Sequence, residues 1–253
     1  STDASSIYNA SGALTFNTGA TPGSSSGTNR FQIASDGSLS TPTAGAANVR
    51  FGVNAGNSIA SGGNFNVVVG DEAGTAVTTG VRNTLIGGSA GDALTDADDN
   101  VAIGQQALSS DTLGSAAVAV GHNALFSQNF TTATSNYNVA IGYKTGEAIT
   151  TGVKNVLMGG NAGDALTDAD FNVAIGHLAL TADTLGSRSV AIGRAALNAQ
   201  NFTTATDSYN VAVGDAAGGA VTTGVQNTLI GSLAGDALTD ADFNVAVGMQ
   251  ALT

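Results

Sequence analysis

Aspartate side chains recur at fixed spacing in this chain, and carboxylate oxygens are ligands that calcium prefers. The octapeptide Gly-Asp-Ala-Leu-Thr-Asp-Ala-Asp begins at Gly91, Gly163 and Gly235. Its spacing lacks the glycine and the closing glutamate of an EF-hand, and aspartate also caps turns through local backbone hydrogen bonds. Turn capping is therefore the alternative to a calcium site. The candidate calcium ligands are Asp92, Asp96, Asp98, Asp164, Asp168, Asp170, Asp236, Asp240 and Asp242.

Catalytic chemistry has few residues to draw on. The chain has no cysteine, and His122 and His177 are its only histidines. They lie three repeats apart, about 14 Å if the repeats stack, so we expect both to be exposed turn residues. A carboxylate pair acting as in a glycosidase is an alternative. We expect no enzyme activity and no cofactor.

A repeated motif must position all of these residues. Asn-x-(Val/Ala/Leu)-(Ile/Val)-Gly recurs with spacings of 17, 17, 17 and 21 residues, so that four repeats make a 72-residue unit. Such a period is the sequence signature of a solenoid, in which each repeat forms one coil. The motif glycines are Gly52, Gly70, Gly87, Gly104, Gly121, Gly142, Gly159, Gly176, Gly193, Gly214, Gly231 and Gly248.

The motif predicts a short strand that is apolar on both faces. In Val101-Ala102-Ile103, for example, the outer two residues and the middle residue point to opposite sides. Parallel strands covered on both faces have this pattern. One face can line the coil's own core, and we expect neighbouring copies of the chain to cover the other, with alanine where the chains approach closely. The prediction is a homotrimer of all-β, parallel β-solenoids, side by side or intertwined.

A coil of 17 residues has room for two short strands and two turns. The asparagine four positions before most motif glycines is expected to form a hydrogen-bonded ladder along the rod, and the glycine to end each strand at positive φ. Stacked at about 4.8 Å, twelve coils make a rod of roughly 55 Å. The 21-residue coils carry loops that we expect to bring four aromatic residues near the surface, either to contact a partner or to cap the solenoid: Phe130, Tyr137, Phe202 and Tyr209.

Charge narrows the choice of partner. The net charge is −12, and all but two of the 19 acidic residues are aspartate. An acidic surface repels phosphate backbones and anionic lipid, so we expect no nucleic-acid partner. No run of about 18 apolar residues is present, so we expect no membrane insertion.

The motif residues resemble two known families. Asn-Val-Ala-Ile-Gly-x-x-Ala, at 100–107 and 172–179, resembles the head repeats of trimeric autotransporter adhesins, although the repeat of that family is shorter than 17 residues. Leu-x-x-Asp-Thr-Leu-Gly-Ser, at 108–115 and 180–187, and the segment 29–39 are similar to phage tail fibres. The resemblance implies left-handed β-rolls, three chains around one axis.

Two segments are expected. Residues 1–47 are interpreted as hairpins and a flexible joint at Ser24–Gly27, or the end of a preceding module, and residues 48–253 as a solenoid shaft that continues beyond this chain. The predicted function is the shaft of a phage tail fibre on a virion, holding a tip that binds a host-cell glycan or protein receptor. A bacterial surface adhesin head and a self-assembling extracellular filament are the alternatives.

Overall fold

The computed structural model describes residues 5–10, 13–18, 28–33, 39–40 and 44–253. Its first part is an antiparallel sheet of four strands, β1 (Ser5–Ala10), β2 (Ala13–Thr18), β3 (Thr28–Ile33) and β4 (Leu39–Ser40), in that order. Hairpin pairing of β1 with β2 and of β2 with β3 is antiparallel throughout. The joint predicted at Ser24–Gly27 lies outside the described residues.

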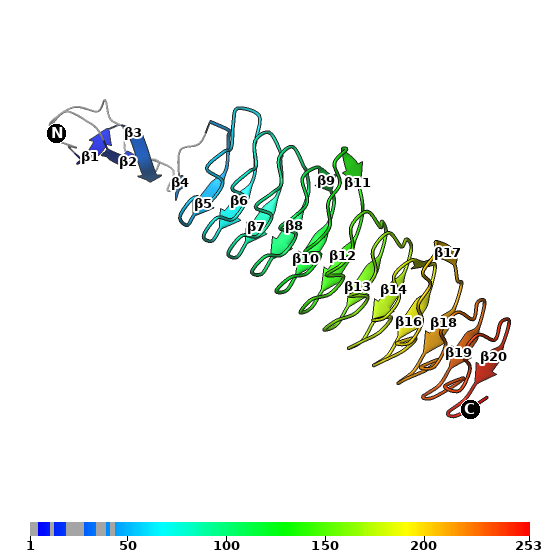
Figure 1. Ribbon diagram of the computed structural model, residues 1–253. Helices are drawn as coiled ribbons and strands as arrows, with labels where there is room; N and C mark the ends of the chain where they lie inside the picture. Colours follow the sequence, from blue (N-terminus) through cyan, green and yellow to red (C-terminus); the bar gives the residue numbers. More distant parts are fainter. Residues whose placement is uncertain (1–4, 11–12, 19–27, 34–38, 41–43) are drawn as a thin grey trace.

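The rest of the chain is a parallel β-solenoid, as the repeat predicts (Figure 1). Each coil adds one strand to a twelve-stranded sheet, and neighbouring strands pair in register, as Ala102 does with Ala119. The described residues contain no helix. The twelve strands are β5 (Val49–Phe51), β6 (Val67–Val69), β7 (Thr84–Ile86), β8 (Val101–Ile103), β10 (Val118–Val120), β12 (Val139–Ile141), β13 (Val156–Met158), β14 (Val173–Ile175), β16 (Val190–Ile192), β18 (Val211–Val213), β19 (Thr228–Ile230) and β20 (Val245–Val247).

The expectation of two strands in every coil is wrong. Most coils have one three-residue strand, and turns make up the remainder. A second pair of strands forms only where the longer coils insert their loops: β9 (Gly114–Ser115) pairs with β11 (Thr134–Ser135), and β15 (Gly186–Ser187) with β17 (Thr206–Asp207). Backbone hydrogen bonds nevertheless link successive coils at the turns too, as Gly74 N–H donates to the Ala90 carbonyl at 2.9 Å. The turns therefore stack as regularly as the strands.

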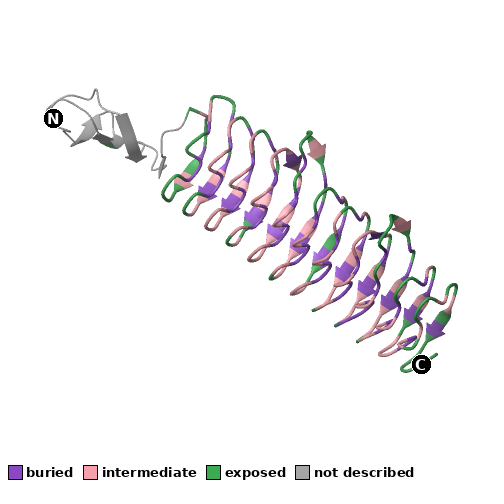
Figure 2. Ribbon diagram, in the orientation of Figure 1, coloured by how far each residue is buried: buried purple, intermediate pink, exposed green. Residues whose placement is uncertain are grey.

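The two faces of the sheet are the reverse of the arrangement we predicted for alanine. The middle residue of each strand from β6 to β19, alanine in most of them, is fully buried inside its own coil (Figure 2). The valine, threonine, isoleucine and methionine residues on either side of it point outward and are half-buried or exposed. Alanine cannot contact a neighbouring chain, because the narrow interior of the coil needs a small side chain at this point.

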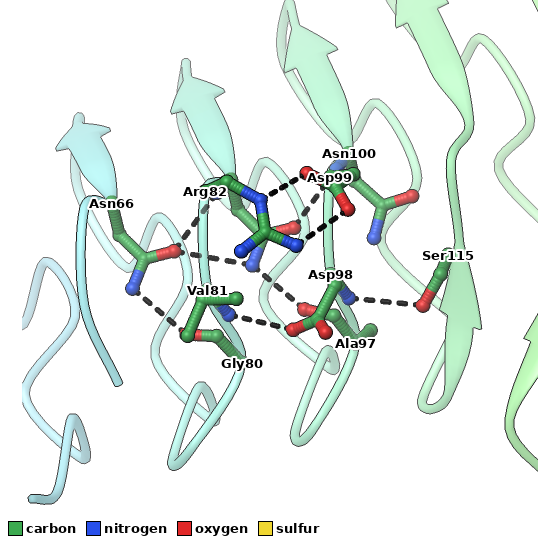
Figure 3. A network of polar contacts seen from close by, with 10 residues as sticks. Asn66, Gly80, Val81, Arg82, Ala97, Asp98, Asp99, Asn100 and Ser115 are labelled. Carbon is green, nitrogen blue, oxygen red and sulfur yellow. Dashed lines mark hydrogen bonds and ion pairs between the residues drawn. The ribbon is translucent and has the colours of Figure 1, made fainter. Parts of the chain in front are cut away.

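Glycine and asparagine form the expected columns. Gly70 has φ of +138°, and a Cβ on it would lie 2.3 Å from the Gly87 carbonyl oxygen of the next coil, so no other residue fits. In the asparagine ladder, Oδ1 of Asn66 accepts the backbone N–H of Asn83 at 2.9 Å, and Nδ2 of Asn83 donates to the Ala97 carbonyl at 2.7 Å (Figure 3). Each buried amide thus satisfies backbone groups that the turns leave without partners.

Candidate binding surface

The outer face of the twelve-stranded sheet is an apolar ribbon. We define it as the residues one and three positions before each motif glycine in β6 to β20, and apart from Thr84 and Thr228 all are valine, isoleucine or methionine. Several have more than a third of their surface exposed, among them Ile103, Met158 and Ile230. At about 4.8 Å for each coil, the ribbon is roughly 50 Å long, far longer than a scattered surface hydrophobe requires.

A second column of side chains runs along one edge of this ribbon. It consists of the residue five positions before each motif glycine, and we call it the side column. Most of its residues are exposed, and all have φ between +49° and +64°, a conformation that costs an L-residue roughly 1–2 kcal/mol. The side column comprises Phe65, Arg82, Asp99, Ala116, Tyr137, Lys154, Phe171, Arg188, Tyr209, Gln226 and Phe243.

Side-column residues contact their neighbours in adjacent coils. Arg82 donates two hydrogen bonds to the carboxylate of Asp99, at 2.6 and 2.8 Å (Figure 3). Further along, the Lys154 ammonium lies 4.9 Å from the centre of the Phe171 ring, and the Arg188 guanidinium lies 4.6 Å from the same ring. The Arg82 guanidinium lowers the pKa of Asp99 through this hydrogen bond.

The opposite edge of the ribbon carries the residues that follow each motif glycine. The His122 ring stacks on the Tyr143 ring at 5.5 Å, and Nδ1 of His122 is buried with no hydrogen-bond partner. His177 is exposed, as predicted, whereas His122 is half-buried. In the same column Arg194 pairs with Asp215 at 2.8 Å. The predicted separation of the two histidines by three coils is confirmed by the order of the strands.

The aromatic residues of the longer loops divide into two kinds. Phe130 and Phe202 are only 6% exposed, because each packs where its loop returns to the solenoid, so the prediction that they lie near the surface is wrong. Tyr137 and Tyr209 are exposed, as predicted, and belong to the side column. The loops therefore expose tyrosine and bury phenylalanine.

The candidate calcium ligands are separated by the turns. Oδ1 of Asp96 accepts a hydrogen bond from the Thr79 hydroxyl at 2.6 Å, and Oδ1 of Asp98 accepts the Val81 N–H at 2.8 Å. Each carboxylate thus bonds to the preceding coil, as the turn-capping alternative requires. Among the residues that the structure describes, no three acidic or histidine side chains gather into a group that could hold a metal ion.

The other candidates repeat this arrangement in part. Burial raises the pKa of Asp92, whose Oδ1 has no hydrogen-bond partner. Asp164 instead accepts hydrogen bonds from the Asn161 amide and the Thr181 hydroxyl. Asp168 and Asp170 accept from the Thr151 hydroxyl and the Val153 N–H, Asp242 accepts from the Val225 N–H, Asp240 from the Thr239 hydroxyl, and Asp236 is half-buried.

Comparison with known proteins adds no relative. No model of a protein family, no curated protein and no solved structure matches this chain. Within the described residues, no helix has the length and apolar character needed to cross a membrane. The function must therefore be argued from the surface itself, an apolar ribbon bordered by aromatic and charged columns, which is the composition of a protein interface with a polar rim.

Proposed function

We propose that this chain is the shaft of an extracellular fibre, a phage tail fibre that holds a receptor-binding tip away from the virion. The observation that carries the proposal is the uninterrupted sheet from β5 to β20, which joins twelve coils into one rod. Backbone hydrogen bonds and the asparagine ladder link every coil to the next. Because each coil contacts only its neighbours, such a rod gains length by adding repeats without changing its cross-section.

In this proposal three copies of the chain bury their outer faces against one another. A ribbon of exposed valine and isoleucine is costly in water, at about 25 cal/mol for each Å² of apolar surface. A second copy presents the same ribbon with the same spacing, so the two surfaces match over the full length. Three copies is the number that the resemblance of the motif implies.

The decisive experiment is the solution mass, measured by light scattering. The proposal predicts about three times 24.6 kDa, and rods of uniform width in electron micrographs. Ile103→Lys places a charge on the outer face and should dissociate the trimer into folded monomers. Thr131→Lys adds the same charge in an exposed loop outside the outer face, and should leave the mass unchanged. A wild-type monomer, or equal effects of the two variants, would contradict the proposal.

A further inference from the structure

The positive charge of this acidic protein is concentrated in a few coils. Four of its seven lysines and arginines lie between Lys144 and Arg194, together with both histidines from His122 onward. All of these residues lie within about four coils at the edges of the outer face. A cationic region on a chain of net charge −12 is suited to an anionic partner, since it attracts the opposite charge locally.

Within this region the side column alternates regularly. Tyr137, Lys154, Phe171, Arg188 and Tyr209 occupy five successive coils, and we call them the basic aromatic band. The three rings are 57%, 39% and 49% exposed in chain order. Successive coils are about 4.8 Å apart, so both the rings and the cations recur every 10 Å or so along a straight line.

The two cations are held in place and still available. Both lie over the Phe171 ring, and Arg188 is also 5.8 Å from the Tyr209 ring, so that less side-chain freedom is lost when a ligand binds. Arg188 shares one hydrogen-bonding edge with Asp207 at 3.1 Å. Lys154 is in none of the ion pairs formed by the described residues.

We propose that the basic aromatic band binds an acidic polysaccharide whose strand lies along the solenoid axis, with one carboxylate in each disaccharide. Two sugar rings of an extended chain span nearly the length of two coils, so each carboxylate meets a cation and the intervening sugar meets an aromatic side chain. DNA fits poorly, because each of its strands carries a charge every 3.4 Å or so, about three times as dense as the cations.

This inference goes beyond the proposed function, because it places a binding site on the shaft itself. It rests on the proposed function only in requiring that the rod lie outside a cell. The 72-residue repeat supplies substitutions that the fold already accepts. Lys154→Gln copies Gln226, Phe171→Asp copies Asp99, and Arg188→Ala copies Ala116, each from the equivalent position of another unit.

Calorimetry with hyaluronan oligosaccharides, which carry one carboxylate in each disaccharide, tests the proposal. Chitin oligosaccharides of the same length, which are neutral, are the control ligand. We expect hyaluronan to bind, to bind more weakly as salt is raised, and to bind about tenfold more weakly to Lys154→Gln and to Arg188→Ala, as expected for loss of one charge-assisted hydrogen bond. Arg82→Gln, at the same position of the coil but outside the band, should bind as the wild type does.

A gain of binding can also be tested. Asp99→Phe combined with Ala116→Arg copies the band onto the coils next to Arg82, and should increase the number of oligosaccharides bound by each chain. Absence of hyaluronan binding, equal binding of chitin, or band variants that bind normally would overturn the proposal. So would band variants that change the mass in light scattering, because the side column would then be a contact between chains. Loss of the trimer in the wild type with binding retained would instead contradict the fibre alone.

Discussion

Gln128 donates a hydrogen bond from Nε2 to Oδ2 of Asp111 at 2.6 Å, and both side chains are fully buried. Each lies seven positions after a motif glycine, where most other coils have valine, leucine or isoleucine. Leucine stands three positions earlier in the coils of this polar kind, and glycine in the others. Each coil therefore takes one large aliphatic side chain from one of two positions. The polar coils have Leu108, Leu125, Leu180 and Leu197, and the apolar coils have Val77, Leu94, Ile149, Leu166, Val221 and Leu238.

Exchange of these two positions should be energetically coupled. A Cβ on Gly146 would lie 2.9 Å from Leu157 and 3.1 Å from Ile149, so Gly146→Leu alone overfills the coil and should cost roughly 1–3 kcal/mol. Ile149→Ala alone leaves a cavity and should cost about 2–5 kcal/mol. The double variant should be more stable than the sum of the two costs predicts, by roughly 0.5–3 kcal/mol in urea unfolding. Strict additivity would show that the two side chains do not share one space.

A gap in the asparagine ladder is filled from a distant part of the chain. Ala117 stands where asparagine is expected and offers no side-chain acceptor to the next coil. Oδ1 of Asn136, in the inserted loop, accepts the Asn138 N–H at 2.9 Å instead, while its Nδ2 donates to the Ser115 carbonyl. In the equivalent coil, the hydroxyls of Ser189 and Ser208 bond to each other at 2.5 Å.

Asn136→Ala should therefore destabilise the protein although Asn136 is not part of the repeated motif. It leaves the buried Asn138 N–H without an acceptor, at a cost of roughly 1–3 kcal/mol. Adding Ala117→Asn returns an acceptor in the usual ladder position, and should recover a large part of the loss in chemical unfolding. Asn129→Ala, at an exposed position in the same loop, is the control and should have little effect. No recovery in the double variant would refute the idea that Asn136 completes the ladder.

The motif allowed the parallel coils, the glycine column and the asparagine ladder to be predicted, because each depends on a residue that recurs at a fixed position. It could not decide which face of Val101-Ala102-Ile103 points inward, since both faces are apolar. The side column was missed because its residues, such as Asp99, Lys154 and Phe171, share no chemical type. What they share is a left-handed backbone conformation and exposure, which only the coil geometry reveals. Phe130 was misplaced because a loop length does not show which side chain packs back.

Calcium should have no effect on stability. Asp96 and Asp98 already accept hydrogen bonds from the preceding coil, and a metal ion would have to displace them. We expect the thermal unfolding midpoint to be the same in excess calcium and in excess chelator. Asp98→Asn retains an acceptor for the Val81 N–H and should lower the midpoint less than Asp98→Ala does. A midpoint that rises with calcium in the wild type, and not in Asp98→Asn, would restore the calcium interpretation.

The buried carboxyl of Asp111 should make stability depend on pH. Burial raises its pKa above 3.8, against hydrogen bonds from Gln128 and from the Phe130 and Gly114 N–H groups that lower it. Between pH 3.8 and the higher folded pKa, the folded protein holds a proton that the unfolded chain has lost. The stability that this carboxyl contributes is therefore greatest at low pH, and falls as the pH rises through the folded pKa.

The free energy of unfolding of the wild type minus that of Asp111→Asn isolates this group, because all other carboxylates cancel. We expect the difference to fall as the pH rises above 3.8 and to become constant above the folded pKa. Asp99→Asn is the control of opposite sign. Arg82 lowers the pKa of Asp99, so the stability it contributes is present above pH 3.8 and lost as the pH falls through the folded pKa. If the Asp111 difference also rose with pH, its three hydrogen bonds would outweigh its burial, and the carboxylate would be the form that the fold selects.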